Sequence, residues 1–520
     1  MGTEIKNKEQ AMMCAEDLKI NNTNIKLNNE RITFSDIRCK NLNYQISGKG
    51  ESGITLIALV VTIVVLLILA GITISLVFSE NGIIAKAKEA AEKTNQAAIN
   101  EQKQMNEVGT TIDNMLNGTG GSGEETTTPE PTLPSDGSYS KVKGVNTPNL
   151  GEGMTPIKWD ETKKGWVNTT GSDRDWYDYT AKKWANALTE DGSMWVWIPR
   201  YAYSITSGYH SSSAGNIDVE FMKGITNETS TGRTSFQNAS GQGKWNIHPA
   251  FSYGQTVSGI WVAKFEASPE GATTNTSNSE YNGTGKKLQV KPGVSSWRSI
   301  TISNIYDVCK NYNSALNSHM MKNDEWGAVA YLSKSKYGKQ NEEVWINNSG
   351  SYITGSAGNS ASAEKDVGTT TDYTSTQGVK ASTTGTVYGV YDMSGGAGEY
   401  VAGYVNNGNS SLTSYGSSLV NGEAKTKNVY SKASTDNATN NYNANSGKYG
   451  DAVYETSSNS SSPWNLSWYG DYSHFPSASV PFFVRGGGYG GGTNAGVFAF
   501  AYISGFSSSI LSSRPVLVAL

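Results

Sequence analysis

A long uncharged apolar run divides this chain and restricts what its two sides can become. The run extends from Ile54 to Phe78 and reads ITLIALVVTIVVLLILAGITISLVF, which is long enough to cross a bilayer as a helix. An ordinary secretory h-region is shorter and ends at a small-residue cleavage site. We therefore expect a single membrane-spanning helix over residues 54–78. The lysines before it and Glu80 after it favour an N-terminus on the inner side.

Two further segments connect this run to the rest of the chain. Residues 79–117 are rich in Ala, Glu, Lys and Gln, which are strong helix formers, and we expect a helical stalk there. Residues 118–138 read GTGGSGEETTTPEPTLPSDGS, a composition typical of a flexible linker without a core. The remaining residues, 139–520, are therefore predicted to form the exported domain, and the polar residues 1–53 a leader that is removed.

The composition favours a domain that binds a ligand and argues against binding to nucleic acid. The net charge is −4 and only 17% of residues are charged, so the basic footprint of a nucleic-acid-binding protein is missing. Gly and Tyr are abundant, with 57 and 28 residues, a mixture typical of contact loops in which rigid aromatics and small polar residues combine. Cys14, Cys39 and Cys309 define no disulfide framework, and we expect Cys309 to be a small buried hydrophobe.

Local patterns predict a mixed α+β domain. Residues 195–201 read as an apolar strand ended by proline, and residues 260–266 alternate as a half-buried strand does. Helices are expected over residues 302–317 and 323–333. Glycine, serine and asparagine runs predict long loops over residues 347–385 and 406–462.

The start of the apolar run resembles the cleavage and methylation motif of type IV pilins and pseudopilins. It reads Gly53-Ile54-Thr55-Leu56-Ile57-Ala58-Leu59-Val60. The resemblance implies processing between Gly53 and Ile54, membrane insertion, and contact with pilus subunits. Ala58 departs from the family, which usually has Glu there to register subunits in the filament. A plain signal anchor is the alternative interpretation.

Several segments of the exported domain, in order, resemble the formylglycine-generating-enzyme (sulfatase-modifying factor) branch of the C-type lectin fold. They are His248–Phe251 with Gly259–Ser268, Glu325–Leu332, Gly389–Tyr400, Arg485–Tyr489 and Arg514–Leu517. The resemblance covers about residues 246–520 and implies a C-type lectin fold of the α+β class. We expect residues 139–245 to extend that core.

The resemblance does not carry the family's chemistry with it. Formylglycine-generating members use two late active-site cysteines, and no cysteine follows Cys309. The four histidines do not form a ligand-spaced cluster, so we expect neither catalytic residues nor a metal site. Some family members bind calcium near the segment matched by Gly395 to Glu399, but Glu399 alone cannot supply the oxygens that calcium requires. No cofactor is expected, and calcium stays open.

The C-terminal end is similar to the ligand-binding regions of variable proteins diversified by retroelements, which share this fold. Gly486 to Ser513 lies between Arg485 and Arg514, as the variable segment does in that family. Adenine-directed mutation of asparagine codons cannot produce Lys, Glu, Gln, Met or Trp, and none of these occurs from Gly486 to Leu520. The alternative is a Gly/Ser-rich pair of terminal strands whose apolar residues are buried.

The variable-surface interpretation assigns a role to each side chain of the segment. We expect Arg485 and Arg514 to be structural, and Val497-Phe498 and Val516-Leu517 to fill the core. The predicted ligand-binding residues are Gly488, Tyr489, Gly490, Gly491, Ala499, Ala501, Tyr502, Ile503, Ser504, Phe506, Ser508, Ser509, Ile510 and Leu511.

These expectations combine into a surface-displayed adhesin or receptor-like protein. It would be a single-pass protein of the bacterial cell membrane with a large extracellular domain, incorporated in a pilus if the pilin-type helix assembles. Its partner would be a protein or glycan on another cell, host or phage, with no nucleic acid involved. A structural minor pilin and, less favoured, a formylglycine-generating-type oxidase are the alternatives.

Overall fold

The computed structural model describes residues 138–366, 371–458 and 465–520. All of them belong to one compact unit, Thr128–Leu520. The described residues do not include several predicted segments. These are the leader, the processing pair Gly53 and Ile54, the membrane helix, the stalk and nearly all of the linker. Within the described part of the chain, no helix is long and apolar enough to cross a membrane.

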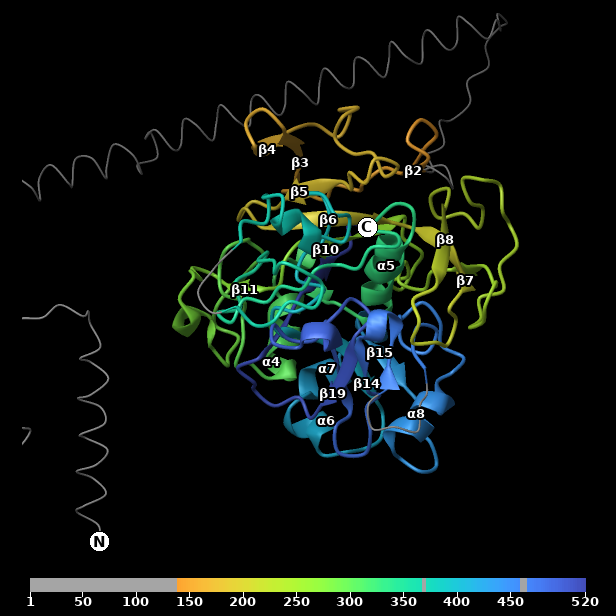
Figure 1. Ribbon diagram of the computed structural model, residues 1–520, viewed down its shortest axis with the longest axis vertical. Helices are drawn as coiled ribbons and strands as arrows, with labels where there is room; N and C mark the ends of the chain where they lie inside the picture. Colours follow the sequence, from red (N-terminus) through yellow and green to blue (C-terminus); the bar gives the residue numbers. More distant parts are fainter. Residues whose placement is uncertain (1–137, 367–370, 459–464) are drawn as a thin grey trace, which may run out of the picture. The chain divides into compact units, whose positions relative to one another are not determined.

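The first large sheet is antiparallel and joins both ends of the domain. Its seven strands run in the order β13-β21-β10-β6-β5-β3-β4 (Figure 1). In chain order they are β3 (Thr155–Asp160), β4 (Gly165–Asn168), β5 (Asn186–Leu188), β6 (Met194–Pro199), β10 (Gly259–Ala263), β13 (His319–Met320) and β21 (Pro515–Leu517). Strands from residues 139–245 therefore share a sheet with the C-terminal strand.

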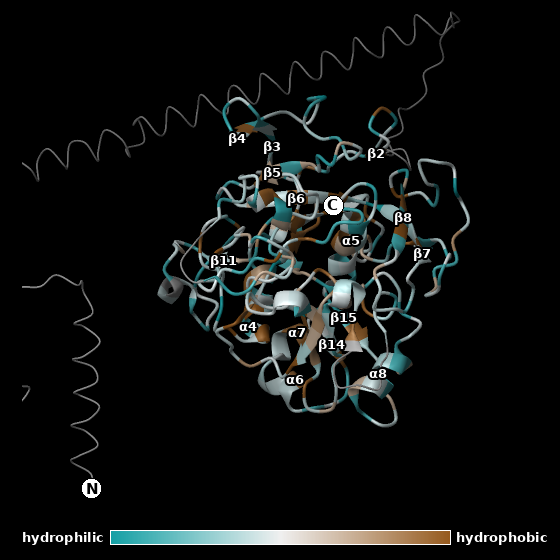
Figure 2. Cartoon of the chain, viewed as in Figure 1, coloured by the Kyte–Doolittle hydropathy of each residue, from teal (hydrophilic) through white to brown (hydrophobic). Residues whose placement is uncertain are grey.

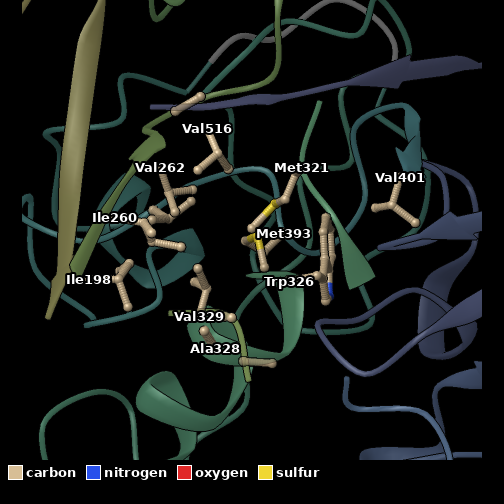
Figure 3. Close-up of a cluster of buried hydrophobic side chains, with 14 of the residues drawn as sticks. Ile198, Ile260, Val262, Met321, Trp326, Ala328, Val329, Met393, Val401 and Val516 are labelled. Carbon is tan, nitrogen blue, oxygen red and sulfur yellow. The ribbon is translucent and has the colours of Figure 1, made fainter. Parts of the chain in front are cut away.

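The two strands expected in this sheet are present, but one is buried more deeply than its pattern predicted. β6 ends at Pro199, as the sequence indicates. β10 was expected to be half-buried, yet all five of its residues are buried. The prediction was wrong because both faces of β10 are covered. On one face, Ile260 and Val262 pack in the core with α5 (Asn323–Lys334), as Figure 3 shows. On the other face, the Trp261 ring lies 5.2 Å from the Trp197 ring and donates to the Asn149 carbonyl at 2.7 Å.

The second large sheet is mixed and carries the candidate segment. Its main order is β15-β14-β18-β19-β17-β16, and β20 also pairs with β14. The strands are β14 (Gly398–Val405), β15 (Asn428–Tyr430), β16 (Asn465–Leu466), β17 (Tyr472–Ser473), β18 (Phe482–Arg485), β19 (Phe500–Ile503) and β20 (Leu511–Ser513). β14 pairs with β20 in parallel through its first half and with β15 in parallel through its second half.

Smaller sheets complete the domain. The order β8-β7-β9 forms a three-stranded sheet, and β1-β2 and β11-β12 form two-stranded sheets. Their bounds are β1 (Tyr139–Ser140), β2 (Val145–Asn146), β7 (Tyr201–Ser207), β8 (Asn216–Phe221), β9 (Asn246–Ile247), β11 (Ser268–Pro269) and β12 (Leu288–Gln289).

The helices are α4 (Ile302–Lys310), α5 (Asn323–Lys334), α6 (Ser411–Ser414), α7 (Ser417–Asn421) and α8 (Ala438–Ala444). Both predicted helices are present, but α4 ends before Asn317, and a short 3-10 turn at Ser314–Leu316 follows it. The loop expected over residues 406–462 was wrong in part, since α6 to α8 and β15 lie within it.

One large apolar core joins the two main sheets and α5. Figure 3 shows Val262 of β10, Val516 of β21 and Val329 of α5 directed toward a common interior, together with Met393 from the turn before β14. Every residue of α5 is buried, including Glu325, whose carboxylate accepts a hydrogen bond from the Lys322 amide at 2.9 Å and so caps the helix. Figure 2 shows mainly white and teal outer loops, with brown stretches on α4 and β8.

Candidate ligand-binding surface

A buried arginine fixes each end of the candidate segment. Arg485, the last residue of β18, is fully buried and donates to the carbonyls of Asp451 at 3.2 Å and Ala452 at 3.1 Å. Burial lowers the pKa of Arg485 to about 10. Its guanidinium lies 5.5 Å from the ring centroid of Trp326 in α5. Arg485 therefore joins the start of the segment to the core, and the expectation of a structural role is confirmed.

Arg514 does the same at the far end. Both carboxylate oxygens of Glu399 in β14 accept from it, with Nε to Oε2 at 2.8 Å, and its Nη1 donates to the Ala263 carbonyl of β10 at 3.1 Å. Burial opposes the charge on Arg514, but Glu399 outweighs burial and the pKa of the guanidinium is raised. The structural role expected for Arg514 is confirmed as well.

Two further carboxylates complete this buried polar network. The Oε1 of Glu266 accepts from the Ala397 amide at 2.9 Å, and Asp392 accepts from the Gly355 amide at 2.8 Å and from Asn347 Nδ2 at 2.8 Å. Burial, followed by the nearby Asp392 and Glu399, raises the pKa of Glu266 well above its usual range. The network braces the turn that leads into β14.

Glu399, the residue matched to the calcium-binding segment of some family members, is engaged by Arg514 in this network. Because Arg514 occupies both oxygens of Glu399, the carboxylate is not directed toward a cation site. Among the described residues, no group of three or more His, Cys, Asp or Glu side chains is placed to hold a metal ion. The structure thus gives Glu399 the alternative role of bracing the turn.

The loop of residues 505–510 is joined to the rest of the domain through its backbone carbonyls, and within the loop the Ser508 hydroxyl accepts from the Ile510 amide at 3.5 Å. The Tyr400 hydroxyl donates to the Phe506 carbonyl at 2.6 Å, and the Ser299 amide donates to the Ser508 carbonyl at 2.8 Å. Arg298 Nη1 donates to the Ser509 carbonyl at 2.7 Å. Each of these three donors to a loop carbonyl comes from outside the candidate segment. Since any residue supplies the same carbonyl, the side chains of Phe506, Ser509 and Ile510 can change without loss of these bonds. Gly505 is restricted, because its φ is +87° and a Cβ there would lie 2.9 Å from the Phe482 ring.

The first part of the segment is held in the same way. The Tyr489 amide donates to the Gly396 carbonyl at 2.8 Å. The Tyr489 ring lies edge-on to Tyr352 at 4.7 Å, and the Arg298 guanidinium lies 4.0 Å from the Tyr352 ring centroid. Because Arg298 also binds Ser509, it links the neighbourhood of Tyr489 to the 505–510 loop. Two stretches far apart in the segment are thereby brought to one surface.

The side chains of these two stretches have room to vary. Phe506 is 43% exposed and Ile510 is 54% exposed, so a ligand can reach both of these large apolar side chains. A Cβ atom added at Gly488 or Gly490 would meet no atom within 4 Å. Gly491 differs, because its Cβ would lie 3.1 Å from both the Ala495 Cβ and the Gly488 carbonyl oxygen. Gly491 therefore serves the turn and is removed from the candidate set.

Two residues that were predicted to contact the ligand, Ala499 and Leu511, are buried, so they are removed from the candidate set. Ala499 is 2% exposed and Leu511 is 7% exposed. Leu511 belongs to β20 and is paired with Gly398 of β14, where its side chain fills the space left by that glycine. A ligand cannot reach either residue while the fold is intact. The lack of strand periodicity in the sequence hid the fact that β20 is a buried strand.

Tyr502 lies on the wrong face of β19 for the predicted surface. Its cross-strand partner is the buried Phe483, and its ring meets His474 at 4.3 Å. Ala501 and Ile503 point to the opposite face because side chains alternate along a strand. The 505–510 loop lies on the Ala501 side, since Tyr400 and Ala501 are both cross-strand partners of Val484. Tyr502 and Phe506 thus do not share one contact surface.

After these corrections a smaller set remains, here called the display surface. Tyr489, Ala501, Ile503, Ser504 and Ser508 are half-buried in it, and Gly490, Phe506, Ser509 and Ile510 are exposed. The display surface consists of Gly488, Tyr489, Gly490, Ala501, Ile503, Ser504, Phe506, Ser508, Ser509 and Ile510. Val497, Phe498, Val516 and Leu517 are buried, as expected for core residues.

Sequence reasoning missed Arg298, Tyr352 and Tyr400 as supports of the display surface. Arg298 lies more than two hundred positions from its partner Ser509, since the separation is 211 residues. It is 2% exposed and lies in no motif that a sequence pattern marks. A buried arginine beside a tryptophan, as in Ser296-Trp297-Arg298, was the one signal, and it does not name a partner.

The residues considered for catalysis are dispersed through the structure. Cys309 is a free, fully buried cysteine, as expected, and burial raises the pKa of its thiol. His248 is buried against Tyr201 and Tyr203, and His319 hydrogen-bonds Glu325 at 2.9 Å. None of these groups lies in the display surface. No family model matches the chain, and no curated protein matches it either.

Proposed function

We propose that the described domain binds a protein or glycan ligand through the display surface, and that this surface is diversified. The observation that carries the proposal is that the loop is held through its backbone while its large side chains are exposed. Outside groups such as Arg298 and Tyr400 hold the backbone of the loop, while Phe506 and Ile510 stand exposed. A surface built in this way can change its contacts without changing its fold.

The chemistry of the segment favours binding over catalysis. From Gly486 to Ser513 the sequence contains no Asp, Glu, His, Lys, Arg or Cys. The segment therefore lacks the carboxylate, imidazole, amine and thiol groups that most often perform general acid–base and nucleophilic chemistry. Exposed Phe506 and Ile510 instead suit apolar anchoring, because a few well-placed apolar side chains dominate the energy of many interfaces.

A C-type lectin fold of the formylglycine-generating-enzyme type is part of the proposal. Motif residues that are far apart in the sequence meet in one buried network, formed by Glu266, Asp392, Glu399 and Arg514. Their convergence supports a shared framework behind the ordered motifs. We further propose that residues 54–78 anchor the domain in the bacterial membrane as a pilin-type helix, and that residues 79–117 hold it away from the membrane as a stalk.

Two libraries of displayed variants test the binding proposal. The first randomises Gly488, Gly490, Phe506, Ser509 and Ile510. The control randomises the buried Ala499, Leu511, Ser512 and Ser513 and the half-buried Gly487, whose Cβ would lie 2.7 Å from the Ala495 Cα. Folded variants are counted by protease resistance, and the folded pool is then selected for binding to hen lysozyme as an unrelated probe. We expect most variants of the first library to fold and binders to emerge from it. Equal loss of folding in both libraries would contradict the proposal.

A further inference from the structure

A groove outside the display surface is lined by β8 and by residues at and after the end of α5. Figure 1 shows these two elements near each other. Its volume is about 660 Å³. The lining comes from β8 with Thr206, from Ser230, Thr231 and Trp245, and from the Lys334–Gln340 stretch. None of residues 486–513 lines it. We call it the β8 groove.

Trp245 is held in this groove by Arg233, which is itself paired with Glu220. The Arg233 guanidinium lies 3.9 Å from the Trp245 ring centroid, and Arg233 is not part of the groove lining. Glu220 holds Arg233 with hydrogen bonds of 3.1 Å and 2.9 Å, and the hydroxyls of Thr229 and Thr231 donate to the same carboxylate. The ring is therefore braced from one side and lines the groove with its remaining surface.

The ion pair of Arg233 and Glu220 adds no net charge to the groove. Burial would raise the pKa of Glu220, but hydrogen bonds from Arg233, Thr231 and Thr229 outweigh it, and the pKa is lowered. Glu220 stays ionised and neutralises Arg233. Two lysines line the groove, and both contact an aromatic residue: Lys334 Nζ donates to the Tyr469 hydroxyl at 2.9 Å, and Lys336 Nζ lies 5.1 Å from the Tyr337 ring centroid. The groove thus lacks the cluster of free cations that a phosphate backbone requires.

Polar side chains without a partner in the described part of the protein line the same groove as the Trp245 ring. Within the described residues, the side chains of Asn216, Asp218 and Gln340 make no hydrogen bond or ion pair to the rest of the protein, although all three line the groove. Asn216 and Asp218 alternate with buried residues on the exposed face of β8. An amide supplies both donors and acceptors, and a carboxylate supplies strong acceptors, so together they match a ligand rich in hydroxyls.

We propose that the β8 groove binds a carbohydrate, with a sugar ring stacked on Trp245 and its hydroxyls bonded to Asp218, Asn216 and Gln340. The negative face of the indole attracts the polarised C–H bonds of such a ring, and the bracing by Arg233 holds the indole ready without a ligand. The site would anchor the protein to a glycan independently of the display surface. An extended peptide added to the open edge of β8 is the competing occupant.

The test uses the full chain in a detergent without a sugar head group. Binding is screened on an array of neutral hexose and N-acetylhexosamine oligosaccharides, and the best oligosaccharide is titrated by calorimetry. We expect Trp245→Ala and Asp218→Ala each to weaken binding by about tenfold or more. The matched control Phe506→Ala/Ile510→Ala should bind as tightly as the wild type. Trp245→Phe should retain part of the affinity. If Trp245→Ala unfolds, the affinities of Trp245→Phe and Asp218→Ala test the proposal in its place.

Three results would overturn the proposal. The first is that no oligosaccharide on the array binds. The second is that Trp245→Phe and Asp218→Ala bind as the wild type does. The third is that a random extended-peptide array, but not the glycan array, gives binding sensitive to Asp218→Ala. Loss of glycan binding in Phe506→Ala/Ile510→Ala instead would move the sugar site to the display surface and would leave the ligand-binding proposal for that surface intact.

Discussion

Arg298 donates a hydrogen bond to the backbone carbonyl of Ser509 while its guanidinium covers the ring of Tyr352. One buried side chain thereby fixes the loop that carries Phe506 and Ile510 and contacts the residue that packs against Tyr489. Its position explains how a loop of small and variable residues can keep a defined backbone. It also makes Arg298 the most sensitive support of the display surface.

Replacing Arg298 should therefore loosen this loop before it affects the core. We expect Arg298→Ala to speed amide hydrogen exchange of residues 505–511 by about tenfold, since a lost charge-assisted hydrogen bond costs roughly 1.5 kcal/mol or more. Exchange in β10 should stay unchanged. Mass-spectrometric exchange of the purified protein measures both regions at once. Equal acceleration in β10 and in the loop would show that Arg298 supports the whole fold.

Two adjacent glycines offer a matched test of which positions can vary. Gly488→Ala should change the free energy of unfolding by no more than about 0.5 kcal/mol, because its Cβ enters open space. Gly487→Ala should destabilise the protein by roughly 2 kcal/mol or more, because φ is +70° and the new Cβ would lie 2.7 Å from the Ala495 Cα. Denaturant titration compares the two. Similar values for both would contradict the assignment of open and closed positions.

The same contrast applies to the apolar residues of the segment. Leu511→Ala should cost about 2–5 kcal/mol, the usual range for a buried leucine. Ile510→Ala should cost little, because Ile510 is 54% exposed. Thermal melting of both variants at one pH checks the difference. A strongly destabilised Ile510→Ala would place Ile510 in the core and remove it from the display surface.

Glu455 should make stability depend on pH. It is fully buried and accepts from the hydroxyls of Tyr203 at 2.7 Å and Tyr331 at 3.0 Å, and burial raises its pKa to about 7 from a usual 4.5. The folded protein therefore binds a proton that the unfolded chain has released. Stability should fall as pH rises from about 4.5 to about 7, by at most about 3 kcal/mol, and then level off.

Glu455→Gln isolates this contribution. His248, whose pKa burial lowers to about 3, acts in the opposite direction, since stability is lost as pH falls below its usual 6.5. The difference in unfolding free energy between Glu455→Gln and the wild type cancels His248. We expect the variant to gain relative stability between pH 5 and pH 8. A constant difference over that range would mean that Glu455 titrates normally.

Breaking the pair of Arg514 and Glu399 should be severe. Removal of one partner leaves a buried charge, which typically costs about 3–5 kcal/mol. Arg514→Lys should lose most of this stability too, because a lysine cannot reproduce the two-pronged contact with Glu399. Denaturation midpoints measure the loss. Wild-type stability of Arg514→Lys would contradict the structural role assigned to the pair.

The sequence predicted elements whose signal is local, and it failed where distant contacts decide. The second predicted helix matches α5, which has strong helix formers and Glu325 as its cap. The full burial of β10 could not be read from its alternation, because it depends on contacts with distant segments, such as α5 on one face (Figure 3) and the Asn149 carbonyl that accepts from Trp261 on the other. Arg485 and Arg514 were assigned as structural because the resemblance to retroelement-diversified variable proteins places them at the two ends of the segment.

The candidate site shows the same limit. Exposure of Phe506 and Ile510 was predicted from the lack of periodicity in the segment, and the structure bears it out. The same lack of periodicity concealed that Leu511 begins a buried strand and that Tyr502 faces away from Phe506. Those facts follow from pairing with β14 and β18, and strand pairing is a property of the fold that no short window of sequence encodes.

Deep sequencing of the DNA that encodes Arg485 to Leu520, across a clonal population and with the neighbouring locus, tests the central claim most directly. The account predicts substitutions that match adenines in a nearby template copy and that concentrate at display-surface codons such as those of Gly488, Phe506 and Ile510. Gly487 and Arg514 should stay constant. An invariant region, without a template copy or a reverse transcriptase gene beside it, would contradict diversification and leave a fixed binding surface.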